Sequence, residues 1–241
     1  MLSVEGVSVR RGKALALDGI NLSIEAGQTL AVVGESGAGK STLISSILGR
    51  LAPSEGTSSW AGAPVRVCRP ALVMQEPRAA FNPALRLRRS VLEPLSARGL
   101  PVPNDRLTRL CAELELPVET LERKPHEVSI GQAQRLGIVR ALIADSPLIL
   151  FDEPLSALDA VTQKHTARLI ADLQREEGFA AVIVTHDLGY ACAYSDTVAV
   201  LRAGRIEETA PTHDFLTSPQ TEYGLSLRDA AISLGALEMA S

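Results

Sequence analysis

Cysteine is scarce in this chain of 241 residues: Cys68, Cys111 and Cys192 are the only three, and they stand far apart. No C-x-x-C pair and no Cys/His spacing of the kind that binds metals occurs, so the sequence predicts no cysteine-ligated metal site. An odd, scattered set of cysteines is typical of a reducing compartment. We therefore expect each thiol to behave as a small buried apolar group.

Long apolar runs are also missing. The first residues, Met1 to Glu5, have neither the basic flank nor the apolar stretch of a signal peptide. No segment approaches the length that is needed to cross a bilayer. We therefore expect a cytosolic chain.

Excess positive charge is absent as well, since the net charge is −4 and the pI is about 5.7. This balance excludes a general nucleic-acid binder, and we expect no nucleic-acid partner. The one basic cluster, Arg86, Arg88 and Arg89, is most simply a solvated helix face, with a partner or acidic lipid headgroups as the alternative. With 46% hydrophobic residues, the length suits one compact unit.

What the chain does contain is a phosphate-binding loop. The apolar run Thr29–Val33 predicts a buried strand that leads into a G-x-x-x-x-G-K-[ST] segment and then a helix. Its nucleotide-binding residues are Gly34, Glu35, Ser36, Gly37, Ala38, Gly39, Lys40, Ser41 and Thr42. The glycines let successive N–H groups curl around the β-phosphate, while the helix N-terminus adds partial positive charge. Lys40 would bridge the β- and γ-phosphates, the Ser41 hydroxyl would ligate Mg²⁺, and Thr42 would donate to the α-phosphate.

A second acidic segment lies far downstream. The apolar run Leu148–Phe151 ends in Asp152 and Glu153. Asp152 is expected to hold the Mg²⁺ shell through water, and Glu153 to act as the general base that polarises the attacking water. Alone, such a strand end could be a simple capped or ion-paired terminus. Together with the loop around Lys40, it predicts a site for ATP and Mg²⁺.

Three further segments occur in a diagnostic order: His126–Arg135 between these two motifs, Ser156–Asp159 just after them, and Ile183–Asp187 near the end. In this order the chain resembles the ATP-binding subunits of ABC transporters over nearly its whole length. Taken singly, Ser129 and Asp159 each look like an ordinary helix N-cap. His186 alone would be a strand-end histidine, and Gln75 alone a turn residue.

The resemblance implies a role for each of these residues across a dimer of ATPase subunits. Ser129, Gly131 and Gln132 would belong to the segment that contacts the γ-phosphate held by the partner subunit. Asp159 would lie in the loop that crosses the interface. His186 would hold the γ-phosphate and the attacking water, and Gln75 would sense Mg²⁺ as a further catalytic residue and metal ligand.

A finer resemblance points to the peptide/nickel uptake branch of that family. It rests on Gln75–Pro83 and Pro125–Glu127, with a weak match near Ser218–Tyr223. In that branch, the turn here written Phe81-Asn82-Pro83 docks the coupling helices of two transmembrane permeases. An extracytoplasmic solute-binding protein would participate indirectly. The resemblance implies a peripheral location on the cytoplasmic face of the inner membrane and a second ATPase chain, either a different chain or a copy of this one.

Two other functions stay open at this point. One is an exporter or lipoprotein-release cassette, and the other is a soluble ABC ATPase in a non-transport assembly such as DNA repair or translation. Members of the second group usually carry coiled-coil insertions or tandem cassettes, which this sequence lacks. The transported solute is not encoded in these residues, because the resemblance leaves solute choice to the permeases and the external binding protein.

Two departures from the family pattern affect the expected mechanism. Ile130 replaces the first glycine of the Ser-Gly-Gly-Gln segment. Because isoleucine resists positive φ and adds bulk, we expect a weakened contribution to the partner's site, and one degenerate site in a heterodimer. No aromatic residue stands near Arg10 and Arg11, where one usually stacks on adenine. We expect a guanidinium, that of Arg11 first, to take its place.

The order of elements predicts an α/β chain with a RecA-like P-loop core, an antiparallel β layer and an α-helical insertion. The core is expected over about 1–84 and 145–241, and the helical subdomain over about 85–144. Alternating strand patterns at Leu2–Val9 and Leu15–Ile24 predict the β layer. Within the insertion, Leu107, Leu110 and Leu114 share one helical face, with Asn104 as the expected N-cap.

Overall fold

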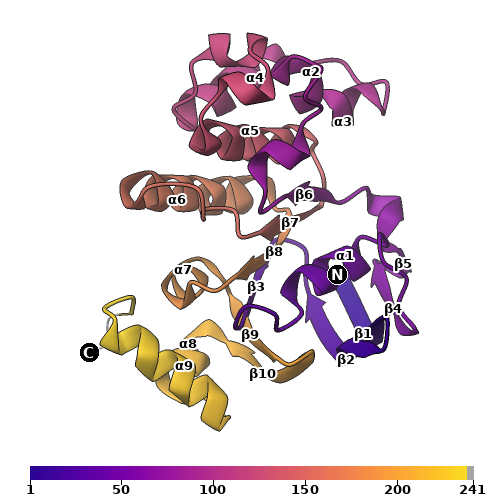
Figure 1. Cartoon of the computed structure of the whole chain (residues 1–241), viewed down its shortest axis with the longest axis vertical. Helices are drawn as coiled ribbons and strands as arrows, with labels where there is room; N and C mark the ends of the chain where they lie inside the picture. Colours follow the sequence, from indigo (N-terminus) through magenta and orange to yellow (C-terminus); the bar gives the residue numbers. More distant parts are fainter. Residues whose placement is uncertain (238–241) are drawn as a thin grey trace.

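A computed structural model describes residues 1–237 of the chain, and Figure 1 shows its layered arrangement. The strands are β1 Leu2–Arg11, β2 Ala14–Ile24, β3 Thr29–Val33, β4 Glu55–Trp60, β5 Ala63–Pro64, β6 Ala71–Val73, β7 Leu148–Asp152, β8 Ala180–Thr185, β9 Thr197–Arg202 and β10 Arg205–Pro211. The α-helices are α1 Lys40–Ile47, α2 Leu87–Val91, α3 Glu93–Ser96, α4 Asn104–Glu113, α5 Ile130–Ile143, α6 Ala160–Glu177, α7 Leu188–Tyr194, α8 Thr212–Thr217 and α9 Glu222–Ser233. Short 3₁₀ turns are η1 Val65–Cys68, η2 Pro77–Ala80, η3 Val118–Glu122 and η4 Pro125–Glu127.

The central sheet has six strands in the order β10-β9-β3-β8-β7-β6. From β9 to β6 the neighbours are parallel, and β10 pairs with β9 as an antiparallel hairpin. All residues of β3 and β8 are buried, as expected for parallel strands covered on both faces. In such a sheet, ligands bind beyond the carboxyl ends of the strands, which is where the loop around Lys40 and the acids after Phe151 emerge.

The predicted antiparallel layer is present as a second sheet in the order β2-β1-β4-β5. Leu2 pairs with Ile24 across β1 and β2, so their apolar side chains turn to the same face. A hairpin forms between β4 and β5, with Trp60 opposite Ala63. Buried residues of β1, β2, α1 and β3 form one apolar cluster, which fixes this layer against the central sheet.

Helices α2 to α5 form the upper part of the molecule in Figure 1. Their apolar side chains, including Leu107 and Leu110 of α4, join a cluster that also contains Phe151 of β7 and Ile170 of α6. The helices therefore share a continuous core with the sheet instead of burying a core of their own. The division at 84/85 and 144/145 stays a prediction.

One local prediction in this region is wrong. Helix α4 begins at Asn104, with Pro103 in the cap position, and the Asn104 side chain makes no capping hydrogen bond. Its amide oxygen instead accepts from Nη2 of Arg88 at 3.2 Å. Asn104 is thus the first helical residue and not the cap, and its oxygen contacts the guanidinium of α2. Leu107, Leu110 and Leu114 are all buried, as the helical pattern predicted.

The cysteine prediction holds for one residue of three. Cys111 is fully buried, whereas Cys68 and Cys192 are half-buried. The Cys68 thiol donates to the carbonyl of Val65 within its own 3₁₀ turn. In the basic cluster, Arg86 pairs with Glu122 at 3.1 Å in an exposed ion pair. Within residues 1–237, no helix is long and apolar enough to cross a membrane.

Candidate active site

The loop after β3 is shaped by close backbone contacts that exclude side chains. A Cβ on Gly34 would lie 2.1 Å from the carbonyl oxygen of Leu201, and one on Gly39 would lie 2.8 Å from that of Ala16. Gly39 also has φ of 113°, which other residues rarely adopt. Gly39 stands directly before α1, so the N–H groups of the loop lie at the N-terminus of that helix. These are the properties of a cradle for phosphate.

Lys40, the first residue of α1, folds back over this loop. Its Nζ donates to the carbonyl of Gly34 at 2.7 Å and to that of Glu35 at 3.0 Å. Burial lowers the pKa of Lys40, while the nearby charges of Glu153 and Asp152 act in the opposite direction. Because a partly buried ammonium is stabilised by anions, this position suits a phosphate group.

Asp152 ends β7 beside the start of α1. The Ser41 hydroxyl donates to Oδ1 of Asp152 at 3.3 Å, which joins the two motifs across the sheet. Burial raises the pKa of the Asp152 carboxyl, and the charge of Glu153 raises it further, against the hydrogen bond from Ser41 and the charge of Lys40. A hydroxyl and a carboxylate at this distance form a hard oxygen donor set, which fits Mg²⁺. The residues present therefore fit the expected metal.

Glu153 is held by two side chains from the end of β8. Its Oε2 accepts from the hydroxyl of Thr185 at 3.3 Å, and its Oε1 lies 2.9 Å from Nδ1 of His186. The backbone N–H of Glu153 donates to Val184 at 2.9 Å, and its φ is +49°, a rare value for a residue with a side chain. Backbone and side chain are thus both fixed by β8. Thr185 is a contact that the motifs did not predict.

Most of the predicted nucleotide residues line one cavity of about 1010 Å³. The predicted residues in its wall are Arg11, Ser36, Gly37, Gly39, Lys40, Ser41, Thr42, Gln75, Asp152, Glu153 and His186. Gly34, Glu35 and Ala38 lie in the same loop but are not part of the wall. Five lining residues were missed by the sequence analysis: Ala14, Leu15, Ala16, Ala203 and Gly204. The Ala203-Gly204 turn joins β9 and β10, and nothing in the sequence pattern indicates that it reaches the phosphate loop.

Arg11 and Arg10 differ in their position relative to the cavity. Arg11 ends β1, pairs with Ala14 of β2 and lines the cavity. Both arginines are exposed, but Arg10 is not part of the wall. The prediction of a base-stacking guanidinium can therefore be kept for Arg11 alone.

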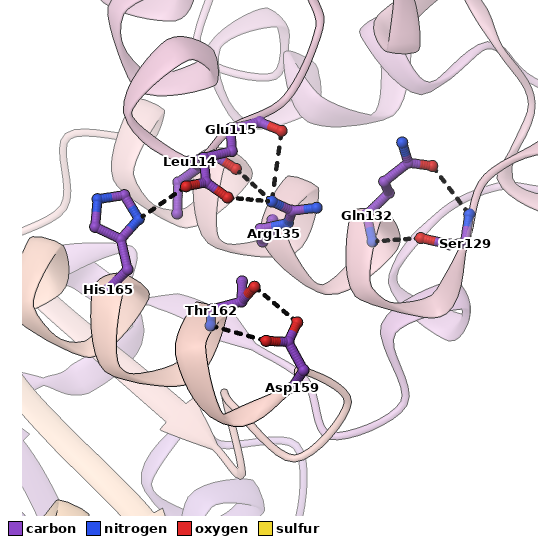
Figure 2. Close-up of polar contacts among 8 residues, drawn as sticks. All are labelled: Leu114, Glu115, Ser129, Gln132, Arg135, Asp159, Thr162 and His165. Carbon is purple, nitrogen blue, oxygen red and sulfur yellow. Dashed lines mark hydrogen bonds and ion pairs between the residues drawn. The ribbon is translucent and has the colours of Figure 1, made fainter.

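The second group of predicted residues lies outside this cavity. Ser129 caps α5 in a reciprocal box: its Oγ accepts from the N–H of Gln132 at 3.1 Å, and its own N–H donates to Oε1 of Gln132 at 3.0 Å (Figure 2). Asp159 caps α6 and accepts from both the N–H and the hydroxyl of Thr162. The N-cap predictions for Ser129 and Asp159 are confirmed. Because the Ser129 oxygen accepts its capping bond, its hydroxyl hydrogen is still available to a phosphate.

The two capped ends lie close to one another. A Cβ built on Gly131 would lie 3.4 Å from Cδ2 of Leu158, so the start of α5 packs beside the loop before Asp159. The Gln132 amide oxygen is engaged in the box with Ser129, which gives this side chain a capping role in the structure. These residues therefore form a second surface on the chain.

Ile130 does not adopt the conformation on which the predicted weakening partly rested. It is the first residue of α5 and is absent from the residues with positive φ. A β-branched residue is tolerated there, because the first helical turn has ordinary negative φ. Its side chain is 54% exposed. The bulk of an apolar side chain beside Ser129 is thus the surviving difference from glycine.

Comparison with known proteins agrees with this geometry. The family model described as ABC transporter matches residues 17–156. The oligopeptide transport ATP-binding protein OppF of Escherichia coli strain K12 is 34% identical over 229 residues, covering 89% of this chain and 69% of that protein. A protein of the same strain named Probable D,D-dipeptide transport ATP-binding protein DdpF is 37% identical over 218 residues, covering 89% of this chain and 70% of that protein.

A solved structure gives the same answer for the fold. The ATP-binding cassette MJ0796, in a dimeric post-hydrolysis state bound to ADP and phosphate, matches with a TM-score of 0.80 and 28% identity, covering 88% of this chain and 99% of that chain. The names of the relatives favour the importer prediction over the exporter and non-transport alternatives. With the phosphate loop, the acidic pair and the capped segment in their places, this chain belongs to the ABC transporter family and is one of its ATP-hydrolysing subunits.

Proposed function

We propose that this chain powers the uptake of short peptides through partner permeases, working as one half of an ATP-dependent dimer. The observation that carries the proposal is the separation of two surfaces on one chain. Lys40, Asp152, Glu153 and His186 surround one cavity, whereas Ser129 and Asp159 lie outside it. A second subunit would bring its own Ser129-type surface over this cavity, and this chain would do the same for the partner.

Within the cavity, each residue would have one task in hydrolysis. The N–H groups before α1 and the Lys40 ammonium would bind the β- and γ-phosphates of ATP. Ser41 and Asp152 would hold Mg²⁺, with Gln75 near it. Bound there, Mg²⁺ neutralises charge that develops on the phosphate oxygens. Glu153 would accept a proton from the attacking water while His186 keeps the carboxylate oriented.

The base of the ATP would lie toward Arg11. The guanidinium is planar and always charged, and it stacks on flat π systems more readily than an ammonium does. Leu15, another residue of the cavity wall, offers apolar surface. This arrangement supports adenine binding by Arg11 in place of the missing aromatic residue.

A second cavity supports the expected contact with permeases. It measures about 360 Å³ and lies where β6, α3 and α5 meet, with Met74, Ala80 and Ala97 in its wall. Met74 directly precedes Gln75, so a permease helix in this groove would touch the segment that reaches the nucleotide site. We propose this groove as the docking place of a permease coupling helix, and Ala97→Trp as the change that blocks it.

Peptides are the proposed solute because both relatives described above are named for peptide transport. The test is to purify the tagged chain from membranes with its permeases and reconstitute the complex in vesicles with the solute-binding protein. ATP-dependent uptake of labelled peptides, absent in Glu153→Gln, is the expected result. Uptake of nickel but no peptide would overturn the peptide proposal, and co-purification with exporter components or with no membrane protein would overturn the importer proposal.

The groove is tested separately. Ala97→Trp is expected to lose the permeases on purification while the full chain binds ATP as before, since Ala97 and Lys40 line different cavities. Retention of both permeases by this variant would remove the groove from the proposed interface.

A further inference from the structure

We propose that Glu115 is a positioning residue for the surface that acts on the partner's nucleotide. The inference rests on the proposed dimer function above. Glu115 lies just beyond α4, and its carboxylate stands between the helix that begins after Ser129 and the helix that begins after Asp159 (Figure 2). No motif of the family pattern includes it.

Glu115 carries a side chain at a backbone conformation that disfavours one. The N–H of Leu116 donates to the carbonyl of Cys111 at 2.8 Å, and the N–H of Glu115 donates to the carbonyl of Ala112 at 3.0 Å. This pair of hydrogen bonds is the Schellman pattern that ends many helices. The residue at the position of Glu115 then has a left-handed conformation, here with φ of +52°. Glycine is the usual residue there, because it has no Cβ to clash. A glutamate at this position is therefore unexpected on backbone grounds.

The side chain makes two contacts that a glycine could not. Its Oε2 lies 3.5 Å from Nη1 of Arg135 in α5, and its Oε1 lies 3.7 Å from Nδ1 of His165 in α6. One carboxylate thus touches one basic side chain on each of the two helices. These contacts are visible as dashed lines on the left of Figure 2.

Arg135 makes the α5 side of this bridge firm. Its side chain is only 15% exposed, and Nη1 also donates to the carbonyl of Leu114 at 3.0 Å and to that of Glu115 at 3.4 Å. A cation on the last carbonyls of α4 is stabilised by the helix dipole as well as by the hydrogen bonds. These backbone contacts hold Arg135 in place independently of the Glu115 carboxylate.

The spacing along the two helices is the same. Arg135 lies six residues after the cap Ser129, and His165 lies six residues after the cap Asp159. Glu115 therefore links equivalent points of α5 and α6, both less than two turns from the ends that would face the partner. We infer that this link sets the position of Ser129 relative to Asp159, and so how well the two contact the partner's nucleotide together.

The decisive variant is Glu115→Gly, since it removes the carboxylate and at the same time relieves the left-handed backbone. For the full chain we expect a thermal midpoint that is unchanged or higher, and an unchanged affinity for ATP, because Glu115 does not line the cavity of Lys40. In the complete transporter we expect about a two- to fivefold lower ATP turnover number, in keeping with polar contacts of a side chain that is 60% exposed.

Two further variants separate charge from general packing. Glu115→Gln keeps an oxygen for Arg135 but loses the charge that faces His165, so an intermediate turnover number is expected. Arg109→Ala is the matched control: it removes the exposed pairs of Arg109 with Glu113 and Glu176 in another part of the α4–α6 contact. This control should leave turnover unchanged.

Three outcomes would overturn the inference. Turnover of Glu115→Gly equal to that of the parent complex would show that the carboxylate positions nothing. A lower thermal midpoint together with weaker ATP binding would show a purely structural role. An equal loss in Arg109→Ala would show that any α4–α6 ion pair has the same effect. If the parent complex itself hydrolyses no ATP, the proposed function fails first, and the inference fails with it.

Discussion

His186 Nδ1 lies 2.9 Å from Glu153 Oε1, and the two side chains differ sharply in exposure. The imidazole is 70% exposed, whereas the carboxylate is 9% exposed. An accessible group therefore orients a buried one. Thr185 holds the other carboxylate oxygen, so the proposed base has both oxygens directed by the end of β8.

This relationship gives the first prediction. Glu153→Gln should abolish ATP turnover while leaving ATP binding close to that of the parent, because the amide keeps the shape of the side chain and one oxygen for His186 but cannot accept the proton. Turnover in the assembled transporter and calorimetric binding to the full chain are the two measurements. Hydrolysis near the parental rate would remove Glu153 from the role of general base.

Lys40→Ala should weaken ATP binding itself. The substitution removes the ammonium that is expected to bind the phosphates, and it also leaves the carbonyls of Gly34 and Glu35 without their hydrogen bonds. A charge-assisted contact of this kind contributes about 2 kcal/mol, so the dissociation constant should rise roughly thirtyfold. Calorimetry with ATP on the full chain measures it. An unchanged dissociation constant would mean that the phosphates bind elsewhere.

Arg11→Ala should lower the affinity for ATP by about 1 kcal/mol if the guanidinium stacks on adenine. Arg11→Tyr should hold or improve the affinity, because an aromatic ring offers the same flat surface. The matched control is Arg10→Ala, which changes an exposed neighbour outside the cavity wall and should have no effect. Equal affinities of the Arg11 variants and the parent would return Arg11 to the solvated surface.

Ile130 gives a prediction about asymmetry between the two sites of a heterodimer. This chain's Ser129 would cover the partner's nucleotide, so the site weakened by Ile130 is the one held by the partner. Glu153→Gln here should then cost more turnover than the matching change in the partner, and Ile130→Gly should raise the weaker site's share. The measurement is hydrolysis by each single mutant of the complete complex.

Two outcomes would contradict the prediction of asymmetric sites. A fully active homodimer, or equal losses from the two glutamate changes, would leave Ile130 as a tolerated substitution. The position of Ile130 as the first residue of α5 makes the glycine variant compatible with the helix start.

Cys192 should react slowly with alkylating agents at neutral pH. Burial raises the pKa of its thiol to about 11, and the charge of Asp187 adds to the effect. Since the thiolate is the reactive form, at pH 8 it should be about a hundredfold rarer than for a thiol of pKa 9. The rate of iodoacetamide labelling, followed by mass spectrometry of the Cys192 peptide with Cys192→Ser as control, should keep rising past pH 10. A rate that levels off near pH 9 would contradict this.

Local patterns explain why much of this protein was readable from its sequence. The loop around Lys40 lies within a few residues of one strand and one helix, so its shape follows from neighbouring glycines and the strand before them. The caps Ser129 and Asp159 were predictable for the same reason, because each bonds to a residue three positions away in its own helix.

The sequence-based predictions failed where a residue's contact partner comes from a distant element of the fold. Asn104 was expected to cap its helix, but Arg88 of another helix engages its oxygen. The wall residues Ala16 and Gly204 reach the cavity only because β2 and the β9–β10 turn fold against the loop of Gly39, a contact between segments far apart in the chain. Half-burial of Cys192 likewise depends on packing that no spacing of cysteines reveals.

The sequence by itself determined the predicted chemistry of each motif, because the residues expected to bind phosphate or polarise water stand side by side and carry their own backbone requirements. Only the tertiary structure decided which motifs meet. Parallel strand pairing brings Ser41 to Asp152 and Glu153 to His186, while Ser129 and Asp159 are placed together on a different surface. The bridge through Glu115 was invisible in the sequence, since three helices converge on one carboxylate only after the chain has folded.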